Sequence, residues 1–223
     1  MNDKQVEVEL KANQITTITF ENEKKKGQVE VIKVDKDNNE IKIPDVTFEI
    51  YDEENNLVDT IITDKEGKAV SKPLPIDQEY LVKETITGDI YVLNEEPQKV
   101  TLQEDEITSI TFENEKKKGQ IKVIKTDGET EVPLQDVIFI VENSKGEIVD
   151  RIITDENGEA TSKRLAIDEQ YTVYEEKTKK GYILSNEKQV VELKENEITE
   201  LKFNNYKEKG SIKITKVSSD GNN

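Results

Sequence analysis

A lysine, a glutamate and an asparagine recur in the same order and at nearly the same spacing in two parts of this 223-residue sequence. The lysine precedes the glutamate by 51 residues in the first set (84 − 33) and by 50 in the second (175 − 125), and the asparagine follows 30 residues later in both. Such a triplet could form an amide, because a neutral amine can attack a carboxamide and release ammonia while a carboxyl group transfers the proton. The two sets are Lys33, Glu84 and Asn114, and Lys125, Glu175 and Asn205.

All six residues lie on the apolar side of an alternating pattern. Side chains in a strand alternate between two faces, so residues two apart share a face. The same parity selects Glu175 over Glu176 and Asn205 over Asn204. The apolar neighbours in the first set are Val29 and Val31 before Lys33, Tyr80 and Val82 before Glu84, and Ile110 and Phe112 before Asn114.

Burial would give this triplet its reactivity. Removal from water lowers the pKa of a lysine and raises that of a glutamate, which leaves a neutral amine and a neutral acid. The predicted product is a Lys–Asn isopeptide bond, formed once in each repeat, with Glu84 and Glu175 as the catalytic acids. Two other interpretations stay open: a strand that simply leaves the core, and a buried Lys–Glu salt bridge with the asparagine as a neighbour.

Internal repetition sets the domain boundaries. The stretch TFENEKKKGQ occurs at residues 19–28 and again at 111–120, and a looser version occurs at 202–211. Equivalent glycines at 27, 119 and 210 are 92 and 91 residues apart, which is the size of a small domain. The predicted units are the last strands of a preceding repeat (1–26), two full repeats (27–118 and 119–209) and the first strand of a following repeat (210–223). Asn22 and Lys216 are then counterparts without a complete set, and the chain is expected to be a segment of a longer protein.

Strand signals dominate both repeats and predict an all-β fold. Short alternating runs are separated by polar turns, and the turn TDKEG at 63–67 is matched by TDENG at 154–158. Several short strands at regular spacing are typical of a β-sandwich. In the first repeat the predicted strands are 29–34, 45–50, 57–63, 80–84, 98–102 and 107–113.

Composition excludes several functions. The chain has no Cys and no His, which rules out thiol nucleophiles, Cys/His zinc sites and histidine bases, so we expect no metal and no cofactor. A net charge of −17 argues against nucleic acid and membrane surfaces and favours a soluble monomer. Asp35-x-Asp37-x-Asn39 resembles the start of a calcium loop, but Glu40 and Val46 stand where such a loop needs Gly and Glu.

The pattern G-x-[VI]-x-V-x-K-x-D, TD-x-x-G, Y-x-V-x-E and F-x-N resembles the Cna B-type repeat of Gram-positive surface adhesins and pilin shafts. The resemblance covers both full repeats and implies tandem prealbumin-like, immunoglobulin-related β-sandwiches in a rod. It also implies that the lysine joins the first strand to the last through the asparagine, with the acid on a middle strand. One departure is the loop after Glu84, where the Gly-Tyr pair of residues 181–182 is not repeated and the shape is expected to differ.

The resemblance implies a structural stalk of a bacterial cell-surface adhesin, located extracellularly at the cell wall, and not an enzyme. The expected partners are neighbouring repeats of the same chain, with host matrix protein bound by other domains of the parent. The alternative is an adhesin module whose own loops bind a host matrix protein. That class would show loops that differ between repeats and carry exposed aromatics, whereas here the loops are short, polar and similar.

Overall fold

The computed structural model describes residues 6–20 and 22–216, and this part of the chain contains strands and no helix. Within it, therefore, no helix is long and apolar enough to cross a membrane. The chain divides into two compact units, one ending at Glu115 and the other beginning at Lys116. The predicted all-β class with two tandem domains is confirmed.

The first domain contains eight strands among the described residues. Each of the six strands that alternation predicted is present, with ends shifted by a few residues. Alternation missed the two short strands β4 and β5. The bounds are β1 (Lys26–Asp35), β2 (Thr47–Tyr51), β3 (Leu57–Ile62), β4 (Lys68–Val70), β5 (Leu74–Pro75), β6 (Glu79–Ile86), β7 (Gln98–Thr101) and β8 (Ile107–Asn114).

The second domain repeats this order over its described residues. It differs mainly in strand ends, which shift by about one residue relative to the first domain. The bounds are β9 (Lys118–Asp127), β10 (Ile138–Asn143), β11 (Ile148–Ile153), β12 (Glu159–Thr161), β13 (Leu165–Ala166), β14 (Gln170–Lys177), β15 (Lys188–Glu192) and β16 (Ile198–Asn205).

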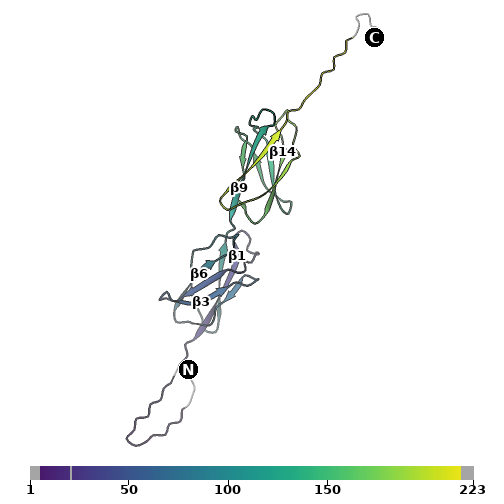
Figure 1. The fold of residues 1–223 in the computed structure, drawn as a ribbon. Coiled ribbons are helices and arrows are strands. Elements are labelled where there is room, and N and C mark those ends of the chain that lie inside the picture. The colour runs from purple at the N-terminus through teal and green to yellow at the C-terminus, as the bar shows by residue number, and fades with distance from the viewer. Residues whose placement is uncertain (1–5, 21, 217–223) are drawn as a thin grey trace. The chain divides into compact units, whose positions relative to one another are not determined.

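Each domain consists of two four-stranded sheets (Figure 1). In the first domain one sheet has the antiparallel order β3-β2-β6-β7. In the other, β1 pairs antiparallel with β4 and β5 on one side and parallel with β8 on the other. The second domain has β11-β10-β14-β15 and a matching sheet in which β9 pairs parallel with β16. The first and last strands of each domain are thus direct neighbours.

A hydrophobic core fills the space between the two sheets of each domain. Val31 of β1 and Phe48 of β2 are both fully buried, and they come from opposite sheets. The rings of Phe48 and Phe112 lie 4.9 Å apart between centroids, and Phe139 and Phe203 repeat this contact at 4.9 Å in the second domain. Tilted ring pairs of this kind add about 0.5–1.5 kcal/mol to the burial of the rings themselves.

The described segments outside the two domains carry no strand. Residues 6–20, 22–25 and 208–216 have neither helix nor sheet assignments. The prediction that the terminal segments are parts of further repeats therefore stays a prediction.

Candidate functional site

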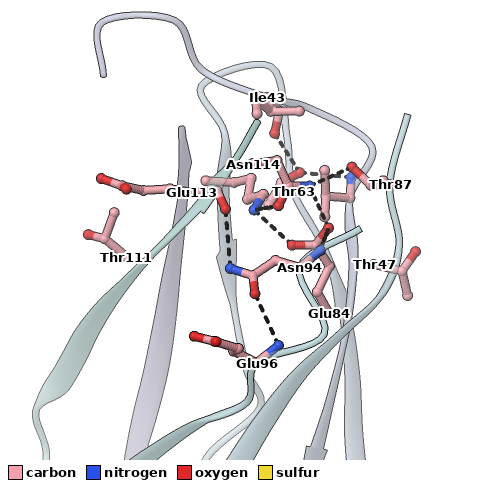
Figure 2. Close-up of polar contacts among 12 residues, drawn as sticks. Ile43, Thr47, Thr63, Glu84, Thr87, Asn94, Glu96, Thr111, Glu113 and Asn114 are labelled. Carbon is pink, nitrogen blue, oxygen red and sulfur yellow. Dashed lines mark hydrogen bonds and ion pairs between the residues drawn. The ribbon is translucent and has the colours of Figure 1, made fainter. Parts of the chain in front are cut away.

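The predicted lysine, glutamate and asparagine of the first domain meet inside the sandwich. Lys33 Nζ donates a hydrogen bond to Asn114 Oδ1 at 2.6 Å and forms an ion pair with Glu84 Oε2 at 2.7 Å. Among the described residues, Oε2 has no hydrogen-bond partner with good alignment beyond this ion pair. Asn114 Nδ2 donates to Glu84 Oε1 at 2.5 Å, and Figure 2 shows these two side chains facing one another. The carboxylate therefore touches both the amine and the carboxamide nitrogen.

The second domain repeats the arrangement with small differences. Lys125 Nζ donates to Asn205 Oδ1 at 2.6 Å and lies 3.2 Å from Glu175 Oε2. Asn205 Nδ2 donates to both oxygens of Glu175, at 2.7 and 2.9 Å. All six residues that the sequence singled out are thus brought together in two sets of three.

Burial of both lysines is complete, and it shifts their protonation. Lys33 and Lys125 are each 0% exposed, and the glutamates and asparagines around them are buried as well. Loss of water lowers the pKa of Lys33 and of Lys125, and the adjacent glutamate opposes this shift only in part. A larger share of each amine is then neutral and nucleophilic than in a solvent-exposed lysine.

Two strands of one sheet and one strand of the facing sheet supply the triplet. Parallel pairing of β1 with β8 sets Lys33 opposite Phe112 and Asp35 opposite Asn114. The lysine side chain therefore reaches an asparagine that lies two residues further along the neighbouring strand than its own partner Phe112. Glu84 comes from β6 across the core, and its strand partner Phe48 packs beside it.

The TD-x-x-G turn holds the backbone of each reactive lysine. Lys33 N donates to Gly67 O at 2.7 Å, and Lys125 N donates to Gly158 O at 2.8 Å. Both glycines have positive φ, +68° and +72°. A Cβ at Gly67 would lie 2.6 Å from Lys33 O, and one at Gly158 would lie 2.4 Å from Lys125 O, so only glycine fits.

A tyrosine and an aspartate form a hydrogen bond beside each site, and no sequence pattern predicted this contact. Tyr91 Oη donates to the buried Asp35 Oδ2 at 3.1 Å, and Tyr182 Oη donates to Asp127 Oδ2 at 2.9 Å. The tyrosine is thus present in both loops, and the first domain has Ile90 where the second has Gly181. Tyr91 stands seven residues after Glu84, as Tyr182 stands seven after Glu175, and the equal spacing was the signal available in the sequence.

Asp35 stabilises the turn that follows β1. Its Oδ1 accepts hydrogen bonds from the backbone N of Asp37 and of Asn38, at 2.8 and 3.0 Å. Among the described residues no group of three or more carboxylates is placed to hold a metal ion. Asn22 and Lys216 are exposed and lie outside any strand.

Comparison with known proteins gives a family and several structural relatives. A family model described as "SpaA: Prealbumin-like fold domain" matches residues 27–116 and 119–207. A structure of the Bacillus anthracis TIE protein is 32% identical to this chain, with a TM-score of 0.62. The match covers 82% of this chain but only 34% of the TIE chain, so the present sequence spans about a third of the length of that relative. GBS52, the minor pilin of Streptococcus agalactiae, is 17% identical (TM-score 0.39, 86% of this chain and 99% of that one). The shaft pilin SpaA of Lactobacillus rhamnosus GG is 14% identical (TM-score 0.39, 84% of this chain and 100% of that one). No curated protein matches the sequence.

Proposed function

This chain belongs to the SpaA prealbumin-like fold domain family, and from that premise we propose that its two domains are structural stalk domains of a Gram-positive cell-surface adhesin. Each domain is closed by an autocatalytic Lys–Asn isopeptide bond, Lys33–Asn114 in the first and Lys125–Asn205 in the second. The parent protein is anchored at the cell wall, and its other domains bind host matrix protein. The domains themselves act as a monomer, without a cofactor and without turnover on any substrate.

The observation that carries the proposal is the contact of one carboxylate with both reacting groups. Neutral Lys33 Nζ attacks the side-chain carbon of Asn114, and a new C–N bond forms as the bond to Nδ2 breaks. Glu84 takes the proton that the amine loses and passes it to Nδ2, which leaves as ammonia. Contacts of 2.5–2.7 Å join the glutamate to each partner, so the proton moves between atoms already in contact.

A bond at this position suits a domain that is pulled from its two ends. The chain enters the first domain at β1 and leaves it at β8, and these strands are direct neighbours. The reacting residues are 81 positions apart in the first domain and 80 in the second. A covalent link there passes the load from the first strand to the last and shields the residues between them.

Stretching a single molecule tests the stalk function. A linked first domain cannot release the 81 residues of its closed loop, whereas an unlinked domain would release about 270–290 Å of chain. Glu84→Gln is the matched unlinked control, and the second domain of the same molecule is the internal reference. Release of the full length from the unmodified domain would contradict the proposal. Binding of a host matrix protein by this two-domain chain alone would instead favour the ligand-binding alternative.

A further inference from the structure

A threonine hydroxyl lies beside each reacting asparagine and takes no part in the proton transfer between lysine, glutamate and asparagine. Asn114 Nδ2 donates a hydrogen bond to Thr87 Oγ1 at 2.8 Å, and Asn205 Nδ2 donates to Thr178 Oγ1 at 2.6 Å. Figure 2 shows Thr87 next to Asn114, on the side of the carboxamide nitrogen. Each threonine is the first residue after the strand that carries the glutamate, and it lies three residues after that glutamate in the sequence.

The threonine completes the hydrogen bonding of the leaving group. A carboxamide nitrogen has two N–H donors, and a buried donor without a partner is costly. In the first domain one donor goes to Glu84 and the other to Thr87, while Oδ1 accepts from Lys33. The three contacts together fix the plane of the carboxamide, with its oxygen toward the amine and its nitrogen toward the acid. That orientation is the one the proton transfer needs, because the proton must arrive at nitrogen.

The loop that carries Thr87 is itself held in place. Downstream of the threonine, Tyr91 Oη donates to Asp35 at the end of β1, and Val92 N donates to Glu115 O just after β8. The second domain anchors the same loop through Tyr182 to Asp127 and through Ile183 N to Tyr206 O. The loop that carries the hydroxyl is thus tied to the ends of the two strands that become linked.

The hydroxyl accepts the same hydrogen bond in both domains, although the residues between the glutamate and the threonine differ. Thr85 and Ile86 separate the glutamate from the threonine in the first domain, whereas Glu176 and Lys177 do so in the second. Both threonines are partly buried, and in both the oxygen faces the carboxamide nitrogen. A contact that persists through a change of its neighbours points to a function of the hydroxyl itself.

We propose that Thr87 and Thr178 are positioning residues for isopeptide formation, which orient the carboxamide and hold its nitrogen as ammonia departs. The inference rests on the proposed function, since it concerns the same reaction. As Nδ2 gains a proton it becomes a stronger donor, and Oγ1 keeps accepting a hydrogen bond from it until it leaves. The threonine neither gains nor loses a proton overall.

The test compares two substitutions that separate the hydroxyl from the shape of the side chain. Thr87→Val keeps the branched shape and removes the oxygen, and Thr87→Ser keeps the oxygen. Chains are made by cell-free synthesis and quenched in denaturant at successive times, and the linked fraction of each domain is read from the cross-linked tryptic peptides. The rate at which the unchanged second domain links serves as the internal reference in each protein.

Loss of one neutral hydrogen bond should slow linking of the first domain by about three- to tenfold in Thr87→Val. Thr87→Ser should react at the unmodified rate, and the second domain should be unaffected in both. Thr87→Val at the unmodified rate, or Thr87→Ser slowed as much as Thr87→Val, would overturn the positioning role while leaving the isopeptide bond intact. Absence of linked peptides from the unmodified chain would overturn the proposed function and this inference together.

A second measurement reports on orientation without the reaction. In Lys33→Ala the first domain cannot link, so the side-chain amide protons of Asn114 remain observable by NMR. Their exchange with solvent should be slow, and adding Thr87→Val should accelerate it for the proton that faced the threonine. Equal exchange in the two proteins would contradict the proposal, because it would mean that the threonine does not hold the carboxamide.

Discussion

Replacing Glu84 by glutamine should leave the first domain folded but without its cross-link. Glutamine has nearly the same size and can still accept the hydrogen bond from Asn114 Nδ2, but its amide cannot carry a proton from Lys33 to the leaving nitrogen. Glu84→Ala and Glu175→Ala should also give folded, unlinked domains. Both substitutions of Glu84 remove the charge that pairs with Lys33, but alanine also removes the oxygen that faces Asn114 Nδ2 and leaves a cavity, so glutamine isolates the effect of the bond more cleanly.

The expected loss of stability follows from the length of the closed loop. A cross-link that closes a loop of 81 residues lowers the conformational entropy of the unfolded chain, which stabilises the folded domain by about 4.5 kcal/mol at 25 °C. In a domain of this size, 1 kcal/mol corresponds to about 4–8 °C in Tm, so Tm of the first domain should fall by about 20–35 °C. The free energy at stake is a large share of the total stability of a small domain.

Differential scanning calorimetry of Glu84→Gln, with the second domain as an internal reference, measures this fall directly. Trypsin should also cut the first domain more readily at temperatures between the old and new transitions. A Glu84→Gln protein that still loses ammonia from the first domain would refute the assigned role of the glutamate. A linked and an unlinked first domain with the same Tm would refute the entropic reasoning.

Three further predictions concern charge and the terminal segments. In Asn114→Ala the isopeptide bond cannot form, so Lys33 stays an amine whose pKa is lowered by burial in the folded domain. Below its ordinary pKa of 10.5, the unfolded chain therefore binds more protons at this lysine than the folded domain does. The free energy of unfolding, measured with denaturant, should therefore rise as the pH approaches 10.5 from below, a slope absent from the linked domain, whose lysine is an amide. The pKa of Asp127 is held at about 2, first by the hydrogen bond from Glu129 N, so acid unfolding of the second domain should steepen as pH falls from about 4 to 2. Asp127→Asn should remove that steepening. Asn22 and Lys216 lack a glutamate and should stay unlinked at high concentration, so a covalent ladder on a denaturing gel would contradict the need for the acid.

Alternation alone predicted the inward-facing side of the strands that carry the site. Because parity fixes the face of every second residue, the sequence by itself was enough to place Lys33 beside Val31 and to choose Glu175 over Glu176. The short strands β4 and β5 were not predicted, because two or three residues are too few to show an alternating pattern.

The loop residues of the site could not be predicted in the same way. Thr87 and Tyr91 follow the end of β6, where the chain has no repeating pattern, and their roles come from contacts with distant strands. The parallel pairing of β1 with β8 is likewise a contact across the whole domain. The family resemblance implied that the first and last strands are joined, and no local pattern in the sequence indicated that they pair in parallel. Comparing the two repeats position by position was the one route to these residues from sequence.

Intact mass tests the central claim most directly. Each completed Lys–Asn bond releases one molecule of ammonia, and both domains hold a complete set of reacting groups in contact. The purified, denatured chain should therefore weigh less than its sequence by two ammonia masses, and tryptic peptides should join the segment of Lys33 to that of Asn114 and the segment of Lys125 to that of Asn205. A mass equal to that of the unmodified sequence would contradict the account and would favour a buried Lys–Glu salt bridge with the asparagine as its neighbour.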